Sequence, residues 1–164
     1  MKKLLITIAF ALFTLGVSAQ KLAEDSGEFL CKEGICFVEK NDMENAISCF
    51  SEAAEHGYAT AYFYLGGIYM KEECGHLNPK LGLSYWKRGA DLGDAKCQYH
   101  YGCALKDGDG IAKNEKHAIY WLVLAAKSGY NDAIIELNEM NVEYRNPSIY
   151  AHRFKRGQYR PCEK

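Results

Sequence analysis

The sequence lacks, over any useful length, the alternation of apolar and polar residues that is typical of a half-buried β-strand, so we predict no β-sheet. It also lacks a second long apolar stretch. Beyond the N-terminal run from Leu4 to Val17, no segment is apolar enough to cross a membrane. A basic surface is missing too, because residues 20–140 carry 12 basic and 19 acidic side chains. This balance argues against nucleic-acid binding.

Motifs of enzymes and metal sites are equally scarce. No Gly-x-Ser-x-Gly motif and no signature of a catalytic cysteine occurs. Cys97, His100 and Cys103 share one predicted helix, but Cys103 is rotated well away from the other two, and no second ligand pair completes a closed zinc site. The run from Asp107 to Gly110 lacks the third acidic ligand and the bidentate Glu of a calcium loop. We therefore predict no metal site and no cofactor.

What the sequence does contain is a repeat. Gly57, Gly93 and Gly129 are spaced 36 residues apart, and each ends a similar phrase. Such a period is typical of a stacked array of helical or other repeats. Positions preceding each glycine recur at the spacing of one helix face. They are the small residues Ala46, Gly82 and Ala118 and the bulky residues Phe50, Trp86 and Leu122.

The repeated glycines have two predicted roles. Gly57, Gly93 and Gly129 suit the left-handed position that ends a helix. Gly66 and Gly102 lie inside a helical pattern, where glycine is unfavourable by about 1 kcal/mol relative to alanine. Their recurrence indicates a close contact between helices that offsets this cost.

Each unit is predicted to contain two antiparallel helices, which we call helix A and helix B. The fold class is therefore an all-α solenoid of helix pairs, with a repeat domain over residues 20–140. We place the units at about 25–57, 58–93 and 94–129, followed by a capping helix at 131–141. The predicted helices A and B are 25–39 and 43–56, 59–71 and 79–92, and 95–107 and 114–128.

The third unit resembles a Sel1-like repeat, a relative of the tetratricopeptide repeat with a longer loop that carries Gly-x-Gly. Its matching residues run from Cys97 to Gly129 and include Gly108 and Gly110 in the loop. The second unit keeps the helical pattern but has Glu72 and Cys74 at the loop glycine positions, so that loop must turn differently. The first unit resembles an ordinary tetratricopeptide repeat, with a loop about four residues shorter.

The resemblance implies a function in binding. Arrays of this kind bind a protein or peptide in a concave groove lined by helix A, and neither family implies a fixed activity. The groove positions that the resemblance gives here are Phe63, Tyr99, Ile135, Lys96, Met70 and Lys106, with Cys31 in the first unit. Aromatic side chains on such a face are typical anchors, and Lys96 and Lys106 could orient a carboxylate. The alternative is that Phe63 and Tyr99 only pack between adjacent helices A.

Two other function classes stay open. Some cysteine-rich Sel1-like proteins are labelled as β-lactamases, so the resemblance also allows a β-lactamase-like or cell-wall-related hydrolase. The third class is a purely structural module of an envelope assembly. The residues themselves assign no reaction, and they do not identify the protein or peptide partner.

Both ends of the chain carry predictions about location. Residues 1–19 have Lys2 and Lys3, an apolar run and a small-residue pattern, which predict a signal peptide cleaved after Ala19 and a secreted or periplasmic protein without a transmembrane anchor. The alternative is an uncleaved N-terminal anchor. Residues 142–164 form a basic tail, since six basic and two acidic residues follow Met140. This tail could contact an acidic surface, or it could simply be solvated.

The sequence has seven cysteines, an odd number. In an oxidising compartment several would pair, and one would remain unpaired within the chain. A bond from Cys49 to Cys31 or Cys36 is one interpretation, and buried thiols are the other. The bridges that tie helix B to the next helix A in cysteine-rich Sel1-like proteins do not carry over, because only Cys97 matches and its partner position is Ala90.

Overall fold

The computed structural model describes residues 25–142, so the predicted signal peptide and the predicted tail beyond Val142 lie outside the described residues. Contacts divide the chain into two parts, with the boundary in the sequence between Tyr58 and Ala59. From here on, the first unit means the residues up to Tyr58, the second unit means those from Ala59 onward, and a single repeat is called a repeat. The described range is helical and contains no strand. Within that range, no helix combines the length and the apolar character that crossing a membrane demands.

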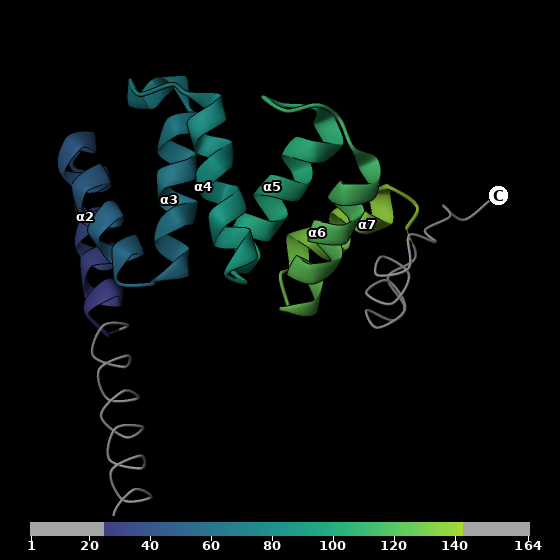
Figure 1. Cartoon of the computed structure of the whole chain (residues 1–164), viewed down its shortest axis with the longest axis horizontal. Helices are drawn as coiled ribbons and strands as arrows, with labels where there is room; N and C mark the ends of the chain where they lie inside the picture. The colour runs from purple at the N-terminus through teal and green to yellow at the C-terminus, as the bar shows by residue number, and fades with distance from the viewer. Residues whose placement is uncertain (1–24, 143–164) are drawn as a thin grey trace, which may run out of the picture. The chain divides into compact units, whose positions relative to one another are not determined.

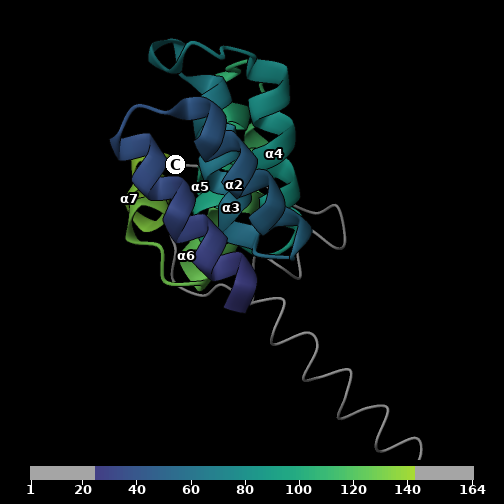
Figure 2. The same ribbon diagram turned by 90° about the vertical axis from the view of Figure 1, so that its left-hand side faces the viewer.

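The first unit is a pair of helices joined by a short turn (Figure 2). Residues 25–39 are helical, and α2 spans Met43–Glu55. Between them the chain reverses through Asn41, which has a positive φ of 58°, and Asp42 caps α2 by accepting from the backbone N–H of Asn45. A Cβ atom at Gly34 would lie 2.7 Å from the ring of Phe50. The missing side chain therefore lets the two helices approach closely.

The second unit is a series of helices, each packed on the next (Figure 1). Helices A are α3, α5 and α7, helices B are α4 and α6, and α3 also contacts α5. This arrangement confirms the predicted all-α repeat fold. The elements are α3 (Ala59–Met70), the 3-10 helix η1 (Glu72–Cys74), α4 (Pro79–Asp91), α5 (Ala95–Asp107), α6 (Glu115–Lys127) and α7 (Asn131–Glu139).

Helices A and B of the second unit meet at a small residue facing a large one. A Cβ atom at Gly66 would lie 2.2 Å from Cδ1 of Trp86, and one at Gly102 would lie 3.0 Å from Cγ of Leu122. Both glycines are buried inside their helices. Packing of the bulky side chain into the space above glycine therefore accounts for residues that are intrinsically poor helix formers.

The glycines with the 36-residue period end the helices B. Gly57, Gly93 and Gly129 have φ values of 84°, 92° and 83°, in the left-handed region that favours glycine. Each is followed by a backbone N–H that donates back into the last turn of the helix, as from Asp94 to the carbonyl of Gly89. This bond belongs to the Schellman motif, which satisfies the terminal carbonyl groups of a helix.

The two A–B loops of the second unit follow different paths to the same end point. The α3–α4 loop contains η1 and turns at Gly75, with φ 72°, whereas the α5–α6 loop turns at Gly108 and Gly110. Both close with equivalent hydrogen bonds. The N–H of Asn78 donates to the carbonyl of Tyr69 at 2.8 Å, and that of Asn114 donates to Leu105 at 2.7 Å.

The same two asparagines then cap the helices B that follow. The side-chain oxygen of Asn78 accepts from the N–H of Leu81, and that of Asn114 accepts from the N–H of His117. Asp42, the cap of α2, belongs to the same series at a spacing of 36 residues. The period therefore includes the start of each helix B, which the sequence-based predictions did not use.

Candidate functional site

Four rings form a continuous line across helices A of the second unit, and we call this line the aromatic strip. It consists of Phe63 on α3, His100 and Tyr99 on α5, and Tyr130 just before α7. The ring centroids of Phe63 and His100 lie 5.3 Å apart, those of His100 and Tyr99 lie 5.1 Å apart, and those of Tyr99 and Tyr130 lie 5.1 Å apart. All four side chains are partly exposed.

Trp86 of α4 supports the strip from the core. Its ring stacks on His100 at 5.0 Å, and its Nε1–H donates to the backbone carbonyl of Phe63 at 3.2 Å. The indole reaches this place because Gly66 has no side chain. Trp86 is only 8% exposed, so the strip rests on a packed base rather than on a loop.

Burial controls the protonation of the strip. Desolvation lowers the pKa of His100, and the positive charges of Lys71 and Lys96 act in the same direction, while Asp132 and Asp94 oppose them. Desolvation also raises the pKa of Tyr99 and of Tyr130. The rings are therefore neutral at pH 7, and the strip is an apolar surface with charged residues beside it.

Three of the six predicted groove residues lie at the aromatic strip, and the other three have different surroundings. Phe63 and Tyr99 both belong to the aromatic strip, and the ammonium of Lys96 lies 5.1 Å from the ring centroid of Phe63. Lys106 instead forms an ion pair with Glu136 on α7, at 2.5 Å, and a second one with Asp107.

The other two predicted groove residues lie apart from the rings of the strip. Ile135 projects from α7 and is 55% exposed. Met70 packs toward α4, where a Cβ atom at Gly82 would lie 2.7 Å from its Cγ. Neither has a role in the ring contacts described above.

Sequence-based reasoning missed His100, Tyr130 and the supporting role of Trp86. His100 was weighed only as a metal ligand with Cys97 and Cys103, yet it holds the centre of the strip. Tyr130 follows Gly129 in the repeated phrase, which could have drawn attention to it. The close approach of Trp86 and His100 joins a helix B to the next helix A, and a repeat alignment alone does not reveal such a contact.

The thiols near the strip are packed and protonated. Cys97 is fully buried against Gly89, where a Cβ atom would lie 2.3 Å from its Sγ, and burial raises its pKa. Burial also raises the pKa of Cys103 to about 11, against a smaller lowering by its hydrogen bond with Tyr99. A thiol nucleophile needs a lowered pKa, so neither environment activates one.

Other candidate chemistry is not assembled in the described range. No disulfide joins the six cysteines there, including Cys49 with Cys31 or Cys36, and Cys162 lies outside. No group of three or more His, Cys, Asp or Glu side chains within residues 25–142 is placed to hold a metal ion.

One pair of side chains on α4 has a spacing that occurs in hydrolases. Ser84 and Lys87 have the Ser-x-x-Lys spacing found in some serine hydrolases. In the structure, the hydroxyl of Ser84 donates to the carbonyl of Leu81, and Lys87 forms an ion pair with Asp91 at 2.7 Å. Each side chain therefore has its own partner on α4.

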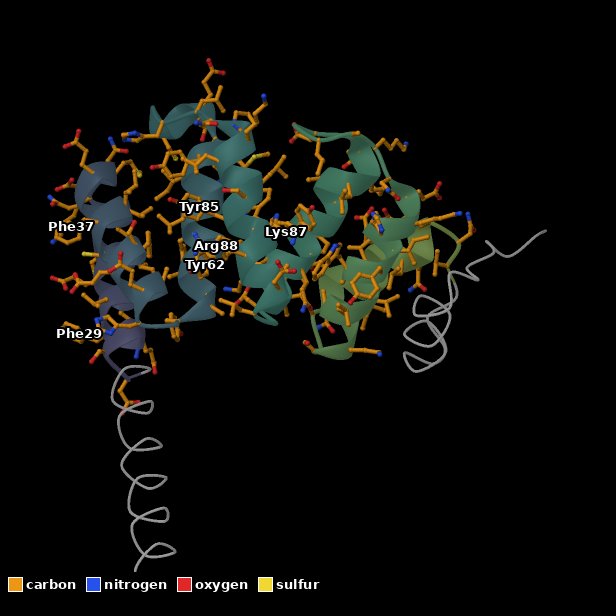
Figure 3. The ribbon with its side chains drawn as sticks, viewed as in Figure 1. Phe29, Phe37, Tyr62, Tyr85, Lys87 and Arg88 are labelled. Atoms are coloured by element: carbon orange, nitrogen blue, oxygen red, sulfur yellow. The ribbon has the colours of Figure 1, made fainter. Side chains whose placement is uncertain are left out.

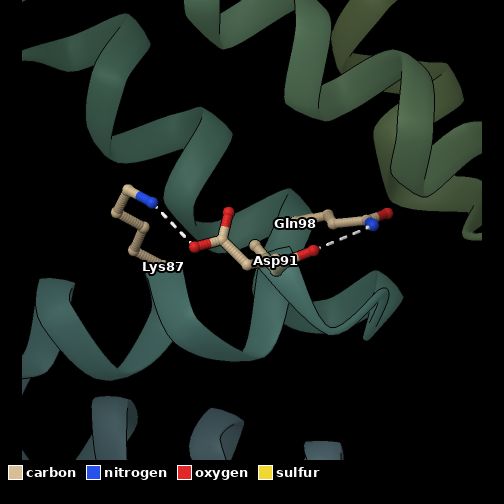
Figure 4. A network of polar contacts seen from close by, with 4 residues as sticks. Lys87, Asp91 and Gln98 are labelled. Carbon is tan, nitrogen blue, oxygen red and sulfur yellow. Dashed lines mark hydrogen bonds and ion pairs between the residues drawn. The ribbon is translucent and has the colours of Figure 1, made fainter.

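A buried amide lies close to that ion pair (Figure 4). Gln98 is 5% exposed, and its Nε2 donates to the carbonyl of Ala90 at 3.3 Å. Its Oε1 accepts no hydrogen bond from the residues that the structure describes. The bond from Gln98 to Ala90 ties α5 to the end of α4.

A second group of rings lies on α3 and α4 (Figure 3). Tyr85 stacks on Tyr69 at 5.7 Å and also approaches Tyr62, and the guanidinium of Arg88 lies 5.3 Å from the ring centroid of Tyr62. Tyr62 is 8% exposed. This group packs α3 against α4, whereas the aromatic strip links α3 to α5.

Comparison with known families agrees with the repeat architecture. The Sel1 repeat model matches three successive segments, residues 18–58, 58–94 and 95–130, which together cover well over half of the chain. The chain belongs to the Sel1 repeat family. A solved structure, the Sel1 repeat protein from Oxalobacter formigenes, superposes with a TM-score of 0.67 at 27% identity, covering 85% of this chain and 61% of that one. A Sel1 repeat protein is consistent with a protein–protein interaction module.

Curated relatives are much longer proteins. DAP3-binding cell death enhancer 1 of Mus musculus is 31% identical over 111 residues, covering 67% of this chain and 21% of that protein. Chitin synthase regulatory factor 3 of Schizosaccharomyces pombe is 32% identical over 117 residues, covering 66% of this chain and 12% of that protein. The chain thus spans about a fifth or less of the length of these relatives.

Proposed function

We propose that this Sel1 repeat protein binds an extended peptide segment of another protein along the aromatic strip. The observation that carries the proposal is the continuity of the strip. Phe63, His100, Tyr99 and Tyr130 make successive ring contacts across α3, α5 and the start of α7, and all remain partly exposed. Partly exposed aromatic rings on a rigid base supply contact area at a low entropic cost.

The names of two relatives support an interaction role. One contains the words DAP3-binding and the other the words regulatory factor, and in both the match covers a small part of the protein. We take these names as support for an interaction role of the Sel1 array in this chain. In this chain the array makes up most of the described range.

Peptide selection tests the proposal. A display library of random peptides is panned against the full chain, and the affinity of recovered peptides is measured by fluorescence anisotropy. The double variant Phe63→Ala/Tyr99→Ala should weaken binding at least tenfold, because truncating an anchor residue at an interface typically costs about 1–2 kcal/mol or more. Unchanged affinity in this variant would rule out the strip as the binding surface.

The matched control is Tyr120→Ala. Tyr120 lies on α6, is partly buried and contacts Trp121. The variant therefore removes a ring of similar burial that lies outside the strip. We expect this variant to bind the peptides as wild type does. Circular dichroism of all variants separates loss of binding from loss of fold.

We also propose that binding takes place in the cell envelope or outside the cell. Support comes from the leader-like residues 1–19, with Lys2, Lys3 and the apolar run that ends before Ala19. Intact-mass measurement of the protein purified from its native host tests this. A mass that begins at Gln20 agrees with the proposal, and an intact N-terminus contradicts cleavage.

A further inference from the structure

The two lysines predicted to face a ligand have different surroundings. Lys106 is neutralised by Glu136 and Asp107. The ammonium of Lys96 lies 5.1 Å from the ring centroid of Phe63 and 6.0 Å from that of Tyr64. Lys96 forms none of the ion pairs within the described range. It is therefore a positive charge held on the surface of the strip, with no carboxylate partner among residues 25–142.

Charge also changes along the strip. Thr60, Lys96 and Asp132 occupy the same register position on α3, α5 and α7, so this row is neutral, positive and then negative. Asp132 and Glu139 are both exposed on α7. An anion approaching the strip is therefore attracted at α5 and repelled at α7.

The surroundings of His100 report the same field. Lys71 at the end of α3 and Lys96 at the start of α5 both lower its pKa, while Asp132 on α7 and Asp94 raise it. Lys71 is exposed and adds a second lysine near His100, while Asp132 on α7 and Asp94 at the N-cap of α5 act against the two lysines. Ring packing restricts the ammonium of Lys96, so less order remains to be lost when an anion binds there.

We propose that the peptide bound by the strip carries an Asp or Glu side chain next to an apolar side chain. The carboxylate lies against Lys96, and the apolar side chain lies on Phe63, His100 and Tyr99. The acidic face of α7 disfavours a second acidic residue at that end, which fixes the direction of the peptide. This inference rests on the proposed function, because it names the chemistry of the ligand for the same strip.

The experiment compares the peptides selected by three forms of the full chain. Wild type should enrich Asp and Glu beside an apolar residue. Lys96→Glu should replace this preference with one for Lys and Arg, and Lys116→Gln should keep the wild-type preference. Lys116 is exposed on α6, so it is a control for the loss of one positive charge away from the strip.

A direct measurement then uses one selected peptide and its Asp→Asn or Glu→Gln counterpart. The amide form should bind wild type about fivefold more weakly, as expected for a partly buried ion pair. The difference should shrink with added salt and should vanish in the Lys96→Gln variant.

The outcomes separate the two proposals. Selected peptides that need Phe63 and Tyr99 but show no excess of Asp or Glu overturn the charge inference and leave the peptide-binding function intact. A selected pool rich in Lys and Arg also overturns it, and would favour a basic segment such as residues beyond Asn141. A strip covered by a second copy of the chain, detected as a dimer that Phe63→Ala dissociates, overturns both.

Discussion

The second and third repeats pair equivalent helices A and B but fill the space between them with different side chains. In the second repeat the indole of Trp86 lies over Gly66, and in the third the smaller Leu122 lies over Gly102. The surroundings differ accordingly. Leu122 belongs to an apolar core with Ile119, Val123 and residues of α7, against which Tyr99 and Tyr130 also pack. Trp86 instead makes a hydrogen bond to Phe63 and stacks on His100.

This difference explains where the aromatic strip begins. A buried indole needs an acceptor for its N–H, and the carbonyl of Phe63 supplies it. The face of the same ring holds His100, which in turn contacts Phe63 and Tyr99. Leucine makes neither contact, and the core around Leu122 instead supports Tyr99 and Tyr130. The end of the strip formed by Phe63 and His100 therefore depends on one unusually large filling residue.

Alanine at the two equivalent glycines should give the largest contrast. Gly66→Ala places a Cβ atom 2.2 Å from an indole that stacking and a hydrogen bond hold in place. We expect a loss of about 2 kcal/mol or more in the free energy of unfolding. Gly102→Ala meets Leu122 at 3.0 Å, and the gain of about 1 kcal/mol in helix propensity should keep it within about 1 kcal/mol of wild type.

Urea unfolding followed by circular dichroism measures both variants. The double variant Gly66→Ala/Trp86→Leu gives the second repeat a smaller filling, as in the third, and should be more stable than Gly66→Ala alone. Equal losses at Gly66 and Gly102 would show that the two repeats are packed alike, against the comparison above. Failure of the double variant to recover stability would point to another neighbour as the obstacle.

Gly89 and Cys97 should show a coupled effect of intermediate size. One period further along the chain, the equivalent residues are Ala125 on α6 and Ala133 on α7. Gly89 and Cys97 are thus a smaller and a larger residue in place of two alanines. Gly89→Ala brings a Cβ atom within 2.3 Å of the Sγ of Cys97, and we expect it to cost about 1–3 kcal/mol. Cys97→Ala alone should cost about 1 kcal/mol, because it leaves a small cavity.

The double variant Gly89→Ala/Cys97→Ala tests the exchange. Its loss should be smaller than the sum of the two single losses, because alanine at 97 removes the clashing sulfur atom. A residual loss is expected, since Cβ of Tyr62 also lies 2.9 Å from the added atom. Strictly additive losses in a double-mutant cycle would contradict the idea of a compensating pair.

The sequence was sufficient to predict the repeats because they depend on local, periodic features. Gly57, Gly93 and Gly129 mark the ends of helices B, and the described helices begin and end within a few residues of the predicted bounds. The shorter first loop was also predictable from the spacing of Gly34 and Phe50. These features repeat, so each copy of the pattern supports the others.

The candidate site was only partly predictable because it is where the repeats differ. The family resemblance, mapped onto the chain by register, placed Phe63, Tyr99 and Lys96 on one face. It could not show that Lys106 is neutralised by Glu136, because that contact depends on side-chain reach between α5 and α7. Nor could it show that His100 stacks on Trp86, since no other repeat has this pair of residues.

The helix caps offer a smaller contrast. The carboxylate of Asp94 caps α5 by accepting from the N–H of Cys97 at 2.8 Å, and it also accepts from the hydroxyl of Thr60 at 2.9 Å. Among residues 25–142, the side chain of Asn114 makes its cap bond to His117 alone. Asn114→Ala should cost about 1 kcal/mol, as is usual for a cap. Asp94→Ala should cost more, and Thr60→Val should account for the difference. Equal losses in urea unfolding would mean that the Thr60 bond adds no stability.

The smallest expected effect is the pH dependence contributed by His100. Its pKa in the folded chain lies below that of the unfolded chain because burial disfavours the imidazolium, an effect that Lys71 and Lys96 support and that Asp132 and Asp94 oppose. The unfolded chain therefore binds more protons once the pH falls below about 6.5, so stability contributed by the neutral ring is complete above that pH and decreases on acidification. No equivalent histidine lies over Leu122 in the third repeat.

Urea unfolding of wild type and His100→Gln between about pH 7.5 and pH 5 should show a steeper loss of stability on acidification in wild type. Parallel profiles would mean that the second repeat tolerates a charged ring beside Trp86, and the contrast with the third repeat would then be one of packing alone.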